Sequence, residues 1–136
     1  MKKFEILPHL ADLKIRAFGK TKEELFYHCL QAMIESMKSE VRKPEEKTKE
    51  KVKIKSLDLE ALLVDFLSEV LYLTQVNREI YNDIKFTKLT DTELEGELIG
   101  QKVERFGEDI KGVTHHDLDI HQRKDGIWEA IVLFDI

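Results

Sequence analysis

The sequence contains a single cysteine, Cys29, in 136 residues. One cysteine cannot form an internal disulfide, and it cannot supply the several thiolates of a structural zinc or iron–sulfur site. The residues at helical spacing around Cys29 are apolar, so we expect it to be a small buried residue rather than a reactive thiol. This cysteine usage is typical of a reducing, intracellular compartment.

Long apolar segments are also lacking. Lys2 and Lys3 are not followed by the apolar stretch that a signal peptide needs. No run approaches the ~20 apolar residues of a membrane-spanning helix. We therefore expect a cytoplasmic protein with no membrane partner.

Motifs for phosphate binding and nucleophilic catalysis are absent. The six glycines are scattered, and neither a glycine-rich phosphate loop nor a Gly-x-Ser-x-Gly motif occurs. The 22 basic and 27 acidic residues give a formal net charge of −5. Because phosphate contacts need clustered lysine and arginine, direct binding of nucleic acid is disfavoured. The sequence gives little support to an independent catalyst.

The chain does contain enough apolar residues, 42%, for an ordinary core. Its length fits a single domain over residues 1–136. Apolar spacing predicts one helix from the capping box of Thr21 and Glu24, and a second helix that begins at Asp58. Between the helices, we interpret residues 38–51 as a solvated connection that leads into a short exposed strand at Val52, Ile54 and Leu57.

Alternating apolar residues predict strands in the remaining segments. Two short strands flank a turn at residues 8–12, and further strands lie at 84–89, 93–99 and 113–121. Asp125 and Gly126 predict a hairpin before the last strand, which is apolar on both faces and therefore central. The expected fold class is α+β: a two-layer sandwich with a mainly antiparallel sheet and two helices on one face.

Two aspartates and the end of the chain are candidate metal ligands. The sequence ends Phe134-Asp135-Ile136, which places an α-carboxylate one residue from Asp135. If the turn at residues 8–12 lies beside that strand end, Asp12 adds a third carboxylate, and such ligands suit Ca²⁺, Mg²⁺ or Mn²⁺. The alternative is that Asp12 forms the turn and Asp135 is a solvated strand end.

Histidines occur near this set and in a second segment. His9 shares the turn with Asp12, where it could bind a cation, orient the Asp12 carboxylate or cap the turn. Strand alternation over residues 115–121 would place two histidines and two aspartates on one face and His116 on the other. Because ligands spread along a strand do not enclose one ion, we expect a solvated face beside a half-buried His116 rather than a zinc site.

Four ordered motifs occur at residues 8–13, 62–73, 110–116 and 132–136. Together they resemble the archease family, the small activators of the GTP-dependent tRNA-splicing RNA ligase, and the resemblance runs along the whole chain. It implies a strand-helix-strand-strand type of fold with an insertion. This sequence has Leu10 where relatives commonly carry Thr, Lys14 where Gly is common, Phe66 for a usual Trp and His115 for a usual Tyr.

The resemblance also implies a divalent-metal site, usually described with calcium, whose ligands are Asp12, Asp135 and Ile136. It marks Lys111 as a functional position. None of these differences from relatives removes a proposed ligand, but the side chain of Lys14 places a positive charge near the site. The implied cofactor is a divalent cation, calcium before magnesium or manganese.

The function that the resemblance implies is promotion of guanylylation and multiple turnover of the ligase catalytic subunit, in tRNA splicing and RNA repair. The protein would be an accessory activator rather than an enzyme, and RNA would be reached only through the partner. One alternative is a small metal-dependent phosphate-ester hydrolase with His9 as base. Another is a metal-independent interaction module that docks through Asp65 and Glu69 on the second helix.

Overall fold

The computed structural model describes residues 1–7 and 12–136 of the chain. The elements are β1 (Phe4–Leu7), β2 (Asp12–Gly19), α1 (Lys22–Ser36), β3 (Glu40–Val41), β4 (Thr48–Lys55), α2 (Leu59–Asn77), β5 (Glu79–Leu89), β6 (Glu93–Arg105), β7 (Gly112–Gln122) and β8 (Trp128–Asp135). Every strand pairing between described residues is antiparallel. The predicted α+β class, with two helices and mainly antiparallel strands, is confirmed.

The strands form two sheets, a division that the sequence patterns do not indicate. The first sheet has the order β1-β2-β8-β7, and in the second β3, β4 and β5 all pair with the long strand β6. Strand β8 lies between β2 and β7, so the predicted central position of the last strand is confirmed. The middle of this strand is buried because both of its edges and one face are covered.

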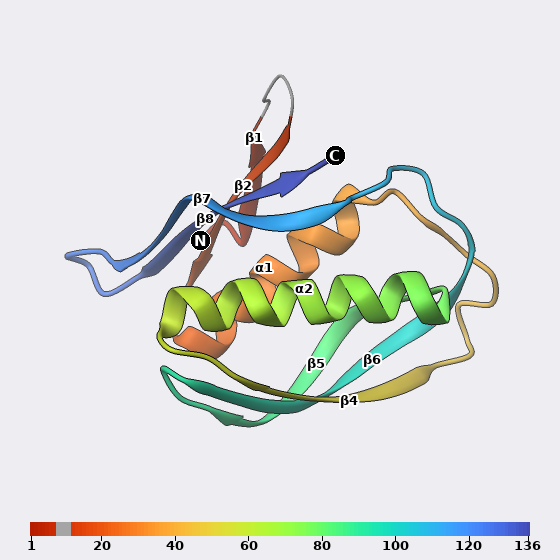
Figure 1. Cartoon of the computed structure of the whole chain (residues 1–136), viewed down its shortest axis with the longest axis horizontal. Coiled ribbons are helices and arrows are strands. Elements are labelled where there is room, and N and C mark those ends of the chain that lie inside the picture. The colour runs from red at the N-terminus through yellow and green to blue at the C-terminus, as the bar shows by residue number, and fades with distance from the viewer. Residues whose placement is uncertain (8–11) are drawn as a thin grey trace.

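The two helices lie between the sheets (Figure 1). Helix α1 packs against β2 and β5, and α2 packs against β7, β4 and β5. Each sheet therefore has helices on one face and solvent on the other. The core combines apolar residues from both helices and both sheets, and its largest fully buried members include Phe26, Phe66, Tyr81 and Phe134.

Both predicted helix starts are confirmed. Thr21 is the N-cap of α1, and its hydroxyl accepts a hydrogen bond from the Glu24 amide at 3.1 Å. Asp58 is the N-cap of α2, and its carboxylate accepts from the Ala61 amide at 2.8 Å. These side chains satisfy amide groups that have no partner within the helix, which fixes where each helix begins.

The interpretation of residues 38–51 as a solvated connection is wrong in part. This stretch contains β3 and the first half of β4, both paired with β6. Apolar alternation does not indicate the start of β4, because its exposed side is a row of lysines and its inner side begins with the polar residues Thr48 and Glu50. Leu57, which we included in the predicted strand, lies beyond it and is 93% exposed.

The hairpin at Asp125 and Gly126 is confirmed, since Gly126 has a positive φ of 90° between β7 and β8. Within residues 1–7 and 12–136, no helix is both long enough and apolar enough to cross a membrane.

Candidate functional site

The candidate ligands lie at one end of the first sheet, where the start of β2, the end of β8 and the start of β7 come together. We call this end of the sheet the acidic edge. Asp12 begins β2 and is the direct cross-strand partner of Asp135, the last residue of β8. On the other side of β8, Gly112 is the partner of Asp135. The condition stated above, that the turn lies beside the end of the last strand, is therefore met at Asp12. Residues 8–11, including His9, lie outside the described part of the chain.

The start of β7 is held against Asp135 by the main chain. The Lys111 amide donates a hydrogen bond to the Asp135 carbonyl oxygen at 2.7 Å. A Cβ atom added to Gly112 would lie 3.9 Å from the Asp135 carboxylate oxygen Oδ2. The Asp135 side chain thus lies close to Gly112, and no other heavy atom outside residues 111–113 comes within 4 Å of that Cβ position. Lys111 itself is exposed, and its backbone belongs to the same edge.

The donor chemistry of this edge fits a hard divalent cation. Asp135 is exposed and Asp12 is half-buried. Ile136, the residue after Asp135 in the chain, is 50% exposed. Like charges placed directly opposite on neighbouring strands repel each other. A cation between the two carboxylates would remove that repulsion, and oxygen ligands suit Ca²⁺, Mg²⁺ or Mn²⁺. Two carboxylates are fewer than such an ion needs, so main-chain oxygens and water would complete its shell.

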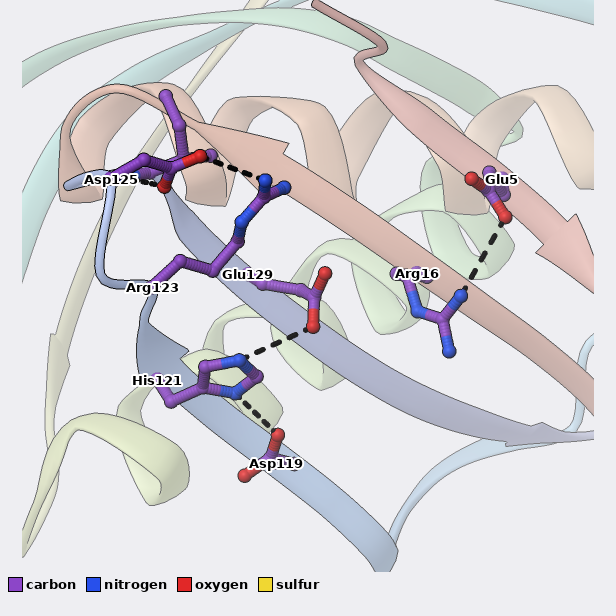
Figure 2. A network of polar contacts seen from close by, with 8 residues as sticks. Glu5, Arg16, Asp119, His121, Arg123, Asp125 and Glu129 are labelled. Atoms are coloured by element: carbon purple, nitrogen blue, oxygen red, sulfur yellow. Dashed lines mark hydrogen bonds and ion pairs between the residues drawn. The ribbon is translucent and has the colours of Figure 1, made fainter.

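No group of three or more His, Cys, Asp or Glu side chains suited to a metal ion occurs in the described ranges. The second histidine-rich segment therefore offers no competing metal centre there. His121 instead lies between two carboxylates, with Nδ1 2.7 Å from Asp119 and Nε2 3.3 Å from Glu129 (Figure 2). These contacts occupy both ring nitrogens of His121.

The expected half-burial of His116 is wrong. Its side chain is 76% exposed, because strand alternation breaks in this segment. The pairing of β7 with β8 shifts register between Thr114 and Asp119, and Asp117 adopts a φ of 55°. Such a bulge adds residues on one strand and turns their side chains away from the regular faces. Periodicity could not locate it, since none of these residues is glycine.

The solvent face of the first sheet carries charged residues that the sequence reasoning did not single out as a group. Asp12, Lys14 and Arg16 alternate along β2 without a register shift, so they share one face. Arg16 lies 3.8 Å from Glu5 of β1 (Figure 2). The departure at Lys14 therefore places a lysine two residues from Asp12, on the same side of the sheet.

The proposed docking residues Asp65 and Glu69 lie on α2, beside β4. Asp65 accepts a hydrogen bond from the Ser56 hydroxyl at 2.6 Å, which ties the helix to the end of β4. Both residues line a shallow hollow of about 450 Å³ with Lys53 and Lys55. Asp65 is thus engaged in a contact within the fold, while Glu69 is half-buried.

Cys29 is fully buried in α1, as expected. Burial raises the pKa of its thiol to about 12, because the thiolate would be poorly solvated in the core. Its interpretation as a small apolar residue rather than a nucleophile is supported by this environment.

The fold and the acidic edge together define an α+β protein with a candidate hard-cation site. Residues 4–136 match the model of the archease protein family. The chain is 36% identical to protein archease from Methanosarcina barkeri, over 99% of this chain and 97% of that protein. It is 33% identical to protein archease from Pyrococcus furiosus, with both chains fully covered. The chain belongs to the archease family.

Two solved structures share the fold. The solution structure of Methanobacterium thermoautotrophicum protein 1598 matches with a TM-score of 0.69 and 27% identity over the whole of both chains. The crystal structure of an archease from Thermotoga maritima, described as a possible chaperone, matches with a TM-score of 0.71. That pair is 19% identical, over 96% of this chain and 94% of the other. The second likeness concerns the fold alone.

Proposed function

We propose that this protein is an accessory activator of the tRNA-splicing RNA ligase, and that it promotes guanylylation and repeated turnover of the ligase catalytic subunit. Membership of the archease family supports the proposal. The single structural observation behind it is the direct opposition of Asp12 and Asp135 at one sheet edge. In this proposal RNA is contacted by the ligase, which agrees with the net charge of −5.

The proposed ligands of the cation are the side chains of Asp12 and Asp135 and the α-carboxylate of Ile136. A bound divalent cation would offset the negative charge that develops at a phosphate during guanylylation. The residues of this chain would position that charge. Asp12 and Asp135 are set by the β2–β8 register, and the main-chain bond from Lys111 to Asp135 fixes the neighbouring segment.

The acidic edge is suited to insertion into a partner's active site because it lies at one end of the first sheet. Lys111, Asp135 and Ile136 are all exposed there. The Lys111 ammonium lies on the segment that pairs with Asp135, so we propose that it contacts the ligase or its nucleotide. In this mechanism the protein supplies positioned charge and no nucleophile.

The test is ligase guanylylation and multiple-turnover ligation, with and without this protein. We expect wild type to stimulate both, and Asp12→Asn and Asp135→Asn to lose most of the stimulation. Glu45→Gln is the matched control, because it removes one exposed carboxylate from the loop between β3 and β4. Absence of stimulation by wild type would overturn the function, and unchanged stimulation by both aspartate variants would overturn the metal-centred mechanism.

The role of Ile136 has its own test. Two residues added after Ile136 would move the α-carboxylate away while leaving both aspartates in place. We expect this extension to weaken stimulation and to weaken calcium binding measured by calorimetry. Full calcium affinity in the extended protein would remove Ile136 from the proposed ligand set.

A further inference from the structure

The outer edge of β1 carries main-chain groups that have no partner in the described structure. The Phe18 amide donates to the Lys3 carbonyl at 2.9 Å, so the main-chain groups of Lys3 point toward β2. Because these groups alternate in direction along an antiparallel strand, those of Phe4 and Ile6 point the other way. Strand β1 pairs only with β2 in the described residues, which leaves the amides and carbonyls of Phe4 and Ile6 available.

A groove of about 750 Å³ lies along the first part of this free edge, from Lys2 to Glu5, and Ile6 continues the same edge beyond the groove. One wall is the N-terminal segment through Phe4 and Glu5, and the opposite wall is β5 with Ile80 and Asn82. The last turns of α1 form the floor. The groove therefore separates the edges of two strands that belong to different sheets, with enough volume for several extended residues.

The floor of the groove contains polar atoms that the chain does not satisfy. Gln31 Oε1 and Ser39 Oγ are inaccessible to solvent and have no hydrogen-bond partner within the described residues. Both residues line the groove. A buried polar group without a partner costs about 1–3 kcal/mol, so these two atoms lower the stability of the protein, and because they are closed to solvent they are not contacts for an occupant of the groove.

The charges around the groove favour an acidic occupant. Glu5 is engaged by Lys2 at 3.2 Å and by Arg16 at 3.8 Å. Lys3 and Lys38 add two positive charges to the lining, against the exposed Glu35, and the Lys38 ammonium also lies 4.0 Å from the Glu108 carboxylate. The three lysines and two glutamates of the lining sum to +1, on a chain whose formal net charge is −5. None of these lining residues belongs to the Asp12–Asp135 edge.

We propose that this groove binds an extended, acidic segment of a partner protein, which adds a strand to the free edge of β1. The main-chain groups of Phe4 and Ile6 would pair with the segment, as in other cases of strand addition. Lys3 and Lys38 would select acidic side chains. The inference is independent of the cation site and of the ligase.

The probe is a fluorescein-labelled heptapeptide of alternating glutamate and valine, and its binding is measured by fluorescence polarisation. The matched probe has lysine in place of glutamate. We expect the glutamate peptide to bind at least about tenfold more tightly, with an affinity that falls as salt is added, because opposite charges attract and salt screens them. Equal binding of both peptides would overturn the proposal.

The decisive variant is Ile6→Pro, which removes an amide that points away from β2. Proline is tolerated on a strand edge where its missing donor would face solvent. Loss of one main-chain hydrogen bond should weaken binding about fivefold, whereas Ile6→Ala, which keeps the amide, should change it less than twofold. Circular dichroism checks that both variants keep the fold, and equal binding by the two contradicts strand addition.

Two further variants separate binding from folding. Gln31→Met removes the unsatisfied oxygen, so it should raise the thermal midpoint of the free protein and leave peptide binding unchanged. Lys3→Glu should weaken binding more than Lys124→Glu, which lies in the distant β7–β8 turn. Sedimentation equilibrium tests the competing occupant: a dimer of this chain that Ile6→Pro dissociates would overturn the proposal.

Discussion

Asp12 and Asp135 lie directly opposite each other on β2 and β8, at the edge where the first sheet ends. Two carboxylates in this register repel each other when both are ionised. If the proposed cation binds here, it offsets this repulsion, and the resulting gain in stability can be measured without any ligase.

In excess chelator, we expect Asp135→Asn to be more stable than wild type by about 0.2–1 kcal/mol, since one of the two opposed charges is gone. Added calcium should then stabilise wild type, by about 2.7 kcal/mol at a hundredfold excess over the dissociation constant, and should leave Asp135→Asn almost unchanged. Urea unfolding with and without calcium measures both effects. Glu45→Gln should follow wild type, and identical calcium responses in all three proteins would contradict the site.

Lys14 should weaken the cation affinity of this edge. It shares the solvent face of β2 with Asp12, and a nearby positive charge opposes the binding of another. Lys14→Gly, which restores the residue common in relatives, should raise calcium affinity severalfold in calorimetry. Lys20→Gly removes an exposed lysine after the far end of β2 and is the control. An unchanged dissociation constant in Lys14→Gly would exclude this influence.

The elements that could be predicted from the sequence are those whose signals are local. Thr21 and Asp58 carry their capping chemistry with them, and Asp125 and Gly126 define their turn in two residues. Apolar spacing then located the buried faces of both helices. No partner strand has to be known for any of these signals.

The elements that could not be predicted depend on pairing. The lysine-rich start of β4 is a strand because β6 extends far enough to pair with it, at Lys49 opposite Ile99 for example. The bulge between Thr114 and Asp119 is likewise a property of the β7–β8 ladder. At the candidate site, the chain positions of Asp12 and Asp135 were evident, but their direct opposition follows only from the register.

Glycines at two positions should respond to very different extents to the same substitution. A Cβ on Gly100 would lie 2.1 Å from the Ile80 carbonyl oxygen, whereas on Gly112 the nearest atom would be 3.9 Å away. We expect Gly100→Ala to lower the free energy of unfolding by about 2–4 kcal/mol, because backbone must move, and Gly112→Ala by less than about 0.5 kcal/mol. Urea denaturation compares them, and a mild Gly100→Ala would contradict the close approach of β5 and β6.

A buried polar pair should contribute strongly to stability. The Tyr81 hydroxyl donates to the Glu79 carboxylate at 2.6 Å, and Lys102 lies 3.1 Å from the same side chain. Burial, together with the Glu79 bond, raises the pKa of Tyr81 above its usual value. Tyr81→Phe should cost about 1.5–3 kcal/mol, as expected for a hydrogen bond to a charged group. Tyr72→Phe on the exposed side of α2 should cost less than about 0.5 kcal/mol in the same urea titration.

The buried thiol of Cys29 should make stability fall at alkaline pH. Burial raises its pKa in the folded protein from the ordinary value of 9.0 to about 12. Between these values the thiol ionises only in the unfolded chain, so the unfolded state binds fewer protons and becomes favoured as pH rises. The expected contribution is a loss of about 1.4 kcal/mol per pH unit, fully developed above the unfolded pKa and absent below it.

Cys29→Ala isolates this effect because it removes the thiol and leaves every other titrating group in place. The variant should be less stable at pH 7, where it leaves a small cavity in the core. Urea unfolding at intervals from pH 7 to pH 10.5 should then show the difference between wild type and variant shrinking as pH rises above 9. A constant difference over that range would mean that the Cys29 thiol ionises equally in the folded and unfolded protein, contrary to its burial.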